Sequence, residues 1–167
     1  MQSMQSVQEQ KEYLPDVGYI IESQLLLSEK EVVDGAKFIG DLNPVHNDPD
    51  NEQTISLGGI IASGSHITAV FSALLPTHFM KFGPMLGAHM DVKFTAPIKP
   101  NTIYTMNWVV QSKEYKKSLG GTIYANAGTI IDPAGNVTVR ANARHVIDGF
   151  GQLEALAEFG HLTRKQS

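Results

Sequence analysis

The sequence predicts an α+β domain in which an antiparallel sheet curls around one central helix. A β-rich segment comes first, helical patterns follow, and the second half alternates apolar and polar residues between turns. The helical pattern from Gly64 to Leu75 contains no Asp, Glu, Lys or Arg, which is typical of a helix buried on most sides. We therefore expect this helix to be the centre around which the strands pack.

Length and composition fit one ordinary globular domain. The chain has 167 residues, 42% of them hydrophobic and 18% charged. The net charge of −4, without a cluster of Lys and Arg, argues against a nucleic-acid partner. No apolar run approaches the roughly 18 residues that cross a bilayer, and Met1–Lys11 lacks the features of a secretory signal. We expect a cytoplasmic protein with no membrane partner and, because cysteine is absent, no disulfides or thiolate chemistry.

We expect three segments: a polar N-terminal extension over residues 1–16, one domain over 17–150, and a short C-terminal helix or tail over 151–167. Within the domain, Val17–Leu27 reads as a strand. Ser28 and Glu31 form a capping box that opens a helix from Glu29 to Ile39, and Gly40 suits the position after its end.

Further helix signals follow. Asp48 and Pro49 are expected to be the N-cap and first residue of a short second helix. Ser63 is the expected N-cap of the central helix, and Pro76 is its expected stop. Four strands are then predicted as a meander: residues 88–95, Ile103–Ser112, Thr122–Ile131 and Val137–Ile147.

The loop from Asp41 to His46 carries the clearest chemistry. A carboxylate and an imidazole stand five residues apart, and Pro44 between them stiffens the chain and biases Asn43 towards extended geometry. Such a pair can point into one cleft and act as general acid and base. The alternative is a capping Asp, a turn formed by Asn43 and Pro44, and an incidental surface His.

The same loop resembles the signature of the MaoC-like, (R)-specific enoyl-CoA hydratase family. The matching residues are Gly40, Asp41, Asn43, Pro44, Val45, His46, Asp48 and Pro49, and the resemblance continues at Gly64, at Ser72 and in the strand Asp91–Ile98. Two positions depart from the pattern: Ile39 stands where members usually carry Ser or Thr, and Ser63 stands where many carry His. These departures affect the substrate assignment more than the reaction type.

The resemblance implies a hot-dog fold and reversible hydration of a trans-2-enoyl thioester to an (R)-3-hydroxyacyl thioester. Asp41 and His46 would be the catalytic pair, with the roles of acid and base left open. The N–H of Gly64, at the positive end of the central helix, suits the enolate oxygen. Asn43, Ser63 and Ser72 are further candidates for the substrate site, although Ser72 is equally suited to bonding its own helix. CoA or an acyl carrier belongs to the substrate, so neither a separate cofactor nor a metal is expected.

Two other functions remain open. A hot-dog thioesterase often carries a carboxylate on or beside the central helix, and Gly64–Leu75 has none. A non-catalytic acyl-binding protein is expected to lack Asp41 or His46, and both are present. The remaining histidines lack metal-ligand spacing. Because an open sheet exposes edge strands, we expect a homodimer or a higher homo-oligomer.

Overall fold

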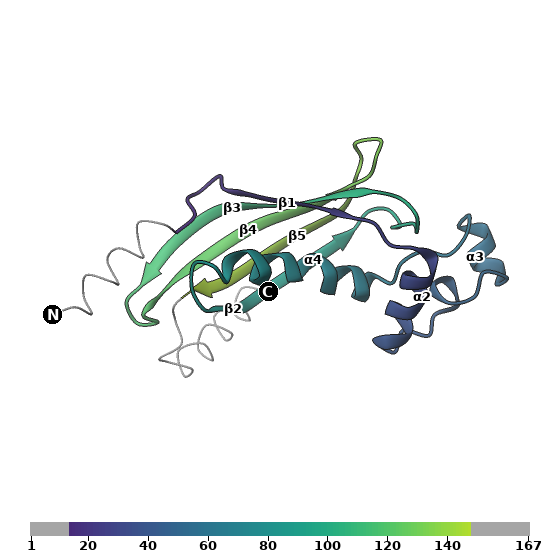
Figure 1. Ribbon diagram of the computed structural model, residues 1–167, viewed down its shortest axis with the longest axis horizontal. Coiled ribbons are helices and arrows are strands. Elements are labelled where there is room, and N and C mark those ends of the chain that lie inside the picture. Colours follow the sequence, from purple (N-terminus) through teal and green to yellow (C-terminus); the bar gives the residue numbers. More distant parts are fainter. Residues whose placement is uncertain (1–13, 148–167) are drawn as a thin grey trace.

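The computed structural model describes residues 14–147. Five antiparallel strands form one sheet in the order β1-β3-β4-β5-β2. The strands are β1 (Ile20–Leu25), β2 (Met85–Phe94), β3 (Tyr104–Lys116), β4 (Gly121–Ile131) and β5 (Val137–Ile147). Figure 1 shows the sheet as one curved layer with the long helix α4 (Gly64–Phe79) along its inner face. The predicted hot-dog arrangement, an antiparallel sheet around a central helix, is confirmed.

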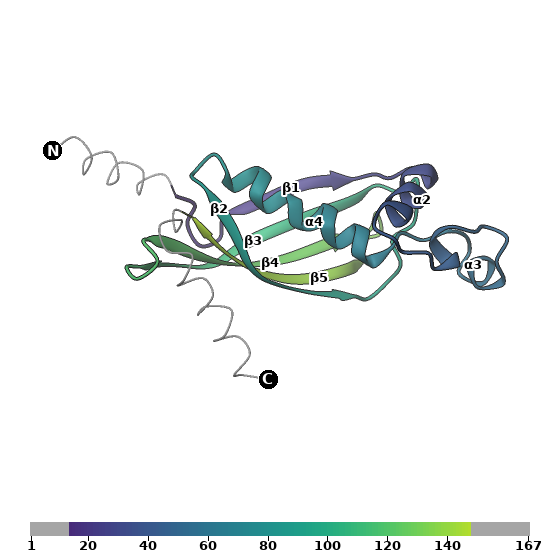
Figure 2. The same cartoon turned by 90° about the horizontal axis from the view of Figure 1, so that it is seen from below.

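Three shorter helical segments lie beyond the end of the sheet at which α4 begins (Figure 2). They are α2 (Glu29–Phe38), the 3₁₀ turn η1 (Pro44–His46) and α3 (Glu52–Ser56). The capping box predicted for α2 is present, because Ser28 accepts from the N–H of Glu31 while the Glu31 carboxylate accepts from the N–H of Ser28.

The predicted start of the second helix is wrong. Asn51 caps α3 by accepting from the N–H of Gln53, whereas Asp48 closes a local turn by accepting from the N–H of Asp50. An Asp followed by Pro suits both a turn and a helix start, and here the better-placed Asn51 side chain determines the helix start.

Pro76 does not stop α4, which continues to Phe79. A proline costs a helix one backbone hydrogen bond. The last turn compensates through Phe79, which is fully buried against the rings of Tyr124 and His145 at centroid distances of 5.2 and 4.3 Å. Tertiary packing therefore outweighs the local signal.

The expectation that α4 is buried on most sides is wrong for the single chain. Its buried residues form one stripe at every fourth position: Ile67, Phe71, Leu75 and Phe79. Ala69 and Ala73 on the opposite side are exposed, and Val70 and Leu74 are half-buried. One uncharged face of the helix is therefore open.

The four later strands do not form a simple meander. β3, β4 and β5 are consecutive neighbours, but β2 pairs with β5 at one edge of the sheet. The chain between β2 and β3 crosses beside the start of α4, where the carbonyl of Ile98 accepts from the N–H of Ala62. Ile98 is buried there, so the crossing segment also covers this end of the core.

The core centres on contacts between α4 and the middle strands. The rings of Phe71 and Trp108 stack at 4.4 Å, and the Trp108 indole N–H donates to the carbonyl of Phe71 at 3.0 Å. Gly128 makes this approach possible, since a Cβ there would lie 2.6 Å from Trp108 and 2.7 Å from Phe71. The helix is thereby fixed along the sheet, which sets the position of its N-terminus.

The first described residues, Leu14 and Pro15, contact the body of the domain. Leu14 packs against the core, and the hydroxyl of Tyr124 donates to the carbonyl of Pro15 at 3.0 Å. The expected C-terminal helix over residues 151–167 and most of the expected N-terminal extension lie outside the described residues. Within residues 14–147, no helix is long and apolar enough to span a membrane.

Candidate active site

The end of α2 determines where Asp41 lies. The N–H of Gly40 donates to the carbonyl of Lys37, and the N–H of Asp41 donates to the carbonyl of Ala36. This pair of bonds is the Schellman motif, which needs a residue with positive φ just after the helix, and Gly40 has a φ of 78°. The predicted role of Gly40 is confirmed, and Asp41 follows directly from this fixed helix end.

Asparagine side chains hold the loop between Asp41 and His46. The Asn43 side chain accepts from the N–H of Val45, and the Asn43 N–H donates to Oδ1 of Asp41 at 3.2 Å. Asn47 donates from Nδ2 to the carbonyls of Asp41 and Asn43, at 3.0 and 2.9 Å. The carboxylate is thus held by its own loop before any substrate binds.

His46 faces Asp41 in a defined orientation. Its Nδ1 lies 2.7 Å from the carbonyl oxygen of Ile61, which can only accept, so Nδ1 carries a proton. Its Nε2 lies 3.5 Å from Oδ2 of Asp41. In the neutral ring, Nε2 is therefore a free acceptor beside the carboxylate.

Ser63 connects the start of α4 to Asp41. Its backbone has N-cap geometry, as predicted, but the hydroxyl does not cap the helix. Instead it donates to Oδ2 of Asp41 at 2.5 Å, and the Ser63 residue is fully buried. This bond and the weaker one from the Asn43 N–H hold the pKa of Asp41 below its usual value, because they stabilise the charged carboxylate.

His46 and the start of α4 share the wall of one pocket of about 420 Å³. Its other walls are largely apolar: Ile61, Ala62, Ile67, Phe94, Thr95, Ala96, Pro97 and Ile98. Gly64 is the first residue of α4, and its N–H has no hydrogen-bond partner among the described residues. Such an N–H, backed by the helix dipole, is suited to a developing negative charge.

The family of the chain follows from a comparison with family models. The model of the MaoC-like domain matches residues 14–128, which include the whole loop, all of α4 and β3, and most of β4. This protein belongs to the MaoC-like domain family.

Solved structures agree with this assignment. The MaoC-like chain is similar to the R-hydratase PhaJ1 from Pseudomonas aeruginosa, with 25% identity, a TM-score of 0.69, and coverage of 80% of this chain and 82% of that one. An (R)-hydratase from A. caviae involved in PHA biosynthesis matches with 20% identity, a TM-score of 0.69, and coverage of 81% and 98%. A MaoC-like dehydratase from Rhodospirillum rubrum matches with 22% identity, a TM-score of 0.70, and coverage of 83% and 95%. No curated protein matches.

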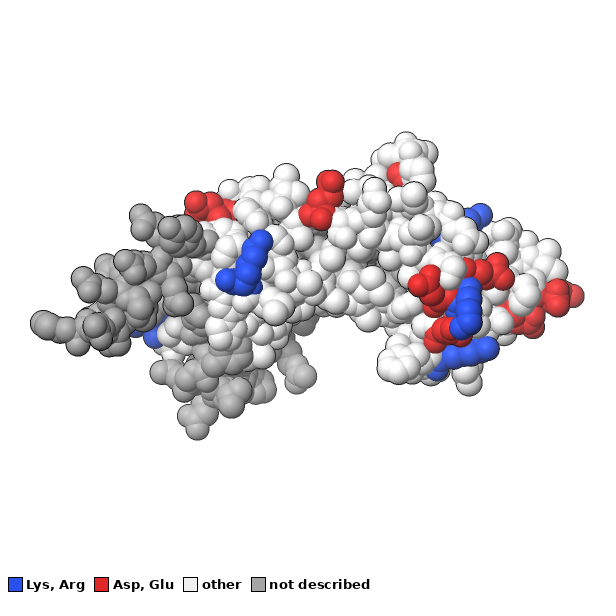
Figure 3. Space-filling view, in the orientation of Figure 1, with Lys and Arg blue, Asp and Glu red and all other residues white. Residues whose placement is uncertain are grey.

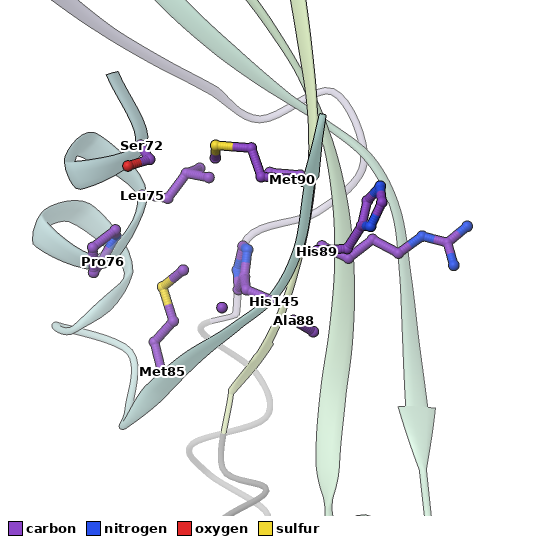
Figure 4. Close-up of a pocket in the computed structure, with 11 residues that line it drawn as sticks. Ser72, Leu75, Pro76, Met85, Ala88, His89, Met90 and His145 are labelled. Atoms are coloured by element: carbon purple, nitrogen blue, oxygen red, sulfur yellow. The ribbon is translucent and has the colours of Figure 1, made fainter. Parts of the chain in front are cut away.

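The predicted site residues of this MaoC-like protein separate into two groups. Asp41, His46, Ser63 and Gly64 lie together, and Asn43 supports them from the loop. Ser72 lies apart from them. It donates to the carbonyl of Ala69 and lines a different pocket, shown in Figure 4, between α4, β2 and β5.

Sequence reasoning missed two contributors to the MaoC-like site. Asn47 binds the loop through its side chain, and the carbonyl of Ile61 orients His46. An Asn inside a Pro-rich loop is a weak signal for such a role, and a backbone carbonyl leaves no signal in the sequence. Among the described residues, no group of three His, Asp or Glu side chains is arranged to hold a metal ion.

Proposed function

We propose that this protein catalyses the reversible addition of water to a trans-2-enoyl thioester, giving an (R)-3-hydroxyacyl thioester. The observation that carries the proposal is the 3.5 Å approach of Asp41 Oδ2 and His46 Nε2 in a site that also holds the free N–H of Gly64. Membership of a family with (R)-hydratase neighbours supports the same reaction.

The pair is suited to binding one water molecule. The carboxylate of Asp41 accepts hydrogen bonds, as does Nε2 of His46 in the neutral ring whose proton is on Nδ1, and a water molecule has two protons to donate. As the water oxygen bonds to Cβ, the pair takes up one water proton and returns a proton to Cα. Because Asp41 Oδ2 and His46 Nε2 lie only 3.5 Å apart, one water between them would supply both groups, and we infer that oxygen and proton add to the same face of the double bond.

The enolate charge that develops on the thioester oxygen needs a separate donor. We assign this role to the N–H of Gly64, for which an unpaired donor at a helix N-terminus is well suited. A Cβ at Gly64 would lie 3.1 Å from the Phe94 ring, so the absence of a side chain keeps this approach open. CoA or an acyl carrier would be part of the substrate, with no further cofactor.

We also propose that the protein acts as a homodimer in the cytoplasm. The open face of α4 carries Ala69 and Ala73, and β2 is an edge strand beside it. In Figure 3, the middle of the visible face has few charged side chains, which gather instead over α2 and α3. An uncharged helix face beside a sheet edge fits a second copy of the chain.

The test is an assay of purified protein with enoyl-CoA esters of increasing length. We expect the conjugated-enoyl absorbance to fall without release of free thiol, and the product to be the (R)-3-hydroxyacyl ester by chiral chromatography. Release of free thiol without loss of the double bond would instead indicate a thioesterase, and no change in either signal would contradict catalysis on this substrate class.

A further inference from the structure

Gly35 stands in the interior of α2, where a glycine is unfavourable. The helix runs from Glu29 to Phe38, and a glycine inside a helix destabilises it relative to alanine because more backbone freedom is lost on folding. The φ of Gly35 is not positive, so the backbone conformation does not require a glycine. The reason for a glycine at this position therefore lies in the space around it.

That space is filled by the ring of His66, the third residue of α4. A Cβ at Gly35 would lie 2.1 Å from both Nδ1 and Cε1 of this ring and 2.7 Å from its Nε2. A real Cβ does not tolerate neighbours at such distances, so the ring lies directly against the backbone of α2. Figure 2 shows α2 beside the first turns of α4.

On the α2 side, the contact is adjacent to the bonds that hold Asp41. The carbonyl of Gly35 accepts from the N–H of Ile39 at 3.2 Å, and the carbonyl of Ala36 accepts from the N–H of Asp41 at 2.9 Å. Ala36 is itself fully buried, so this end of α2 is packed against the rest of the protein. A shift of α2 at Gly35 would therefore carry Asp41 with it.

On the α4 side, the contact lies in the turn that forms the other half of the candidate site. His66 follows Gly64 by two residues, and the carbonyl of Ser63 accepts from the N–H of Ile67 at 3.0 Å, which closes this turn. The Ser63 hydroxyl donates to Oδ2 of Asp41 at 2.5 Å. The start of α4 thus meets α2 through the His66 ring and meets the residue that follows α2 through Ser63.

The separation between α2 and α4 depends on this contact. α2 does not lie on the sheet, and its principal neighbours among the described elements are α4 and the turn η1. Val32, one turn before Gly35, is buried in the core and anchors the middle of the helix. Because Gly35 has no side chain and an imidazole is rigid, the His66 ring defines how closely the next turn of α2 approaches the start of α4.

We propose that the contact between Gly35 and the His66 ring is a positioning contact for catalysis. It sets the separation of α2 and α4, and thereby the place of Asp41 relative to Ser63 and Gly64. Neither Gly35 nor the His66 ring contacts the substrate in this role. The effect on turnover rests on the proposed function, whereas the effect on Asp41 is independent of it.

Gly35→Ala tests the contact with a single methyl group. Helix propensity alone would make this variant more stable, so propensity gives no reason for a loss of function. We expect a folded protein with little change in KM and a kcat reduced by up to about a hundredfold, the loss that a misplacement of about 1 Å can cause. The pKa of Asp41 should rise, because a longer Ser63–Asp41 bond weakens the largest influence that lowers this pKa. Circular dichroism, steady-state kinetics and a ¹³C titration of the Asp41 carboxyl measure these effects.

The second-site change His66→Ala provides the decisive comparison. Gly35→Ala/His66→Ala removes the ring that the new Cβ meets, so kcat and the Asp41 titration should return most of the way to the wild-type values. The double variant should thus turn over faster than Gly35→Ala, although it carries one more substitution. A defect in Gly35→Ala that persists in the double variant would place its cause within α2 and overturn the proposal.

Asp34→Ala is the matched control. It raises helix propensity at the exposed position next to Gly35, without adding an atom to the contact. Both kcat and the Asp41 titration should stay at the wild-type values in this variant. A defect in Asp34→Ala equal to that in Gly35→Ala would show that the contact with His66 is not the cause, which would also overturn the proposal.

The His66 ring has one way to avoid the new methyl group without moving α2. It can turn into the adjacent pocket of about 380 Å³, which Leu27 and Phe38 also line. Wild-type kcat and an unchanged Asp41 titration in folded Gly35→Ala would reveal such a rotation and overturn the proposal. If Gly35→Ala does not fold, His66→Ala alone takes its place. Loss of the ring should then raise the pKa of Asp41, and an unchanged titration would overturn the proposal.

This proposal and the proposed function fail separately. An Asp41 titration that shifts in Gly35→Ala and returns in the double variant supports the positioning contact even in a protein that does not hydrate enoyl esters, a result that would contradict the proposed function alone. Hydration of enoyl esters by the wild type, with neither kcat nor the Asp41 titration altered in Gly35→Ala, would contradict the positioning contact alone.

Discussion

The hydroxyl of Ser63 donates to Oδ2 of Asp41 at 2.5 Å, and the same oxygen faces Nε2 of His46 at 3.5 Å. One carboxylate oxygen therefore has both a fixed donor and the imidazole as neighbours. Ser63 stands where many relatives were expected to carry His, so this chain stabilises the charge on Asp41 with a neutral hydroxyl from the start of α4.

Ser63→Ala should raise the pKa of Asp41, because it removes the largest influence that lowers this pKa. The carboxylate then loses its charge at a higher pH, and turnover at acidic pH should fall more than turnover at neutral pH. The checks are a ¹³C titration of the Asp41 carboxyl and a pH profile of kcat/KM. Ser63→Thr keeps the hydroxyl and should restore the wild-type profile. An unchanged Asp41 titration in Ser63→Ala would show that the bond has no electrostatic role.

Asp41→Asn and His46→Gln should each reduce turnover by about 10² or more, the usual effect of losing a positioned acid or base. Asp50→Asn, an exposed carboxylate near the same loop, is the control and should turn over normally. His46 is buried, with 8% of its surface exposed, and its ring is bonded to the carbonyl of Ile61. Circular dichroism must therefore accompany the His46 kinetics. Near-full activity in either folded variant would contradict the assignment.

Gly64→Pro should reduce the catalytic rate by about 10²–10³, the typical loss when one oxyanion donor is removed. The backbone tolerates this change, since Ser63 already has the extended conformation (φ −62°, ψ 131°) that a residue before proline needs. Gly64→Ala is the matched control, because its Cβ meets the same Phe94 ring at 3.1 Å while the N–H remains. Steady-state hydration of a short enoyl-CoA measures both. Equal rates in the two variants would assign the defect to Phe94 rather than to the donor.

The local signals in the sequence predicted most of the fold. The Ser28–Glu31 capping box and the Gly40 helix end appear where expected, and they place Asp41. Two of the errors arise where long-range packing decides. Pro76 is tolerated because Phe79 is buried, and β2 pairs with β5 because the segment containing Ile98 crosses the end of the core.

In the candidate site, too, the sequence predicted the residues that lie on local features but not the long-range contacts between them. Asp41, His46 and Gly64 could be named from the loop and the helix pattern, because stiff loops and helix starts are local features. The Ser63–Asp41 bond spans 22 residues of sequence, and the partner of His46 is the backbone carbonyl of Ile61. Neither relationship has a sequence pattern. Ser72 shares α4 with Gly64, but it lines a separate pocket between α4, β2 and β5.

The open face of α4 predicts the oligomeric state. Sedimentation at micromolar concentration should show a dimer or a larger oligomer of this chain. Ala73→Glu places a charge on the exposed side of α4 and should weaken the assembly. A stable wild-type monomer would contradict the proposed homodimer.

The neutral, buried ring of His145 also makes stability depend on pH. Its pKa is about 4 in the folded protein, whereas an unfolded chain has a His pKa of about 6.5. Between these values the unfolded state binds a proton that the folded state does not, so stability is greatest above about pH 6.5 and falls as the pH drops towards 4.

The expected loss from His145 over this range is about 3 kcal/mol, from 1.36 kcal/mol for each pKa unit. Urea unfolding of wild type and His145→Phe at pH 7 and pH 5 samples about 2 kcal/mol of this loss, and His145→Phe should show the smaller decline. His78, whose pKa burial also lowers, is present in both proteins, so its effect cancels in the comparison. Asp41 has a lowered carboxyl pKa and contributes only at pH values below this window. Parallel declines in the two proteins would mean that the pKa of His145 does not differ between the folded and unfolded states.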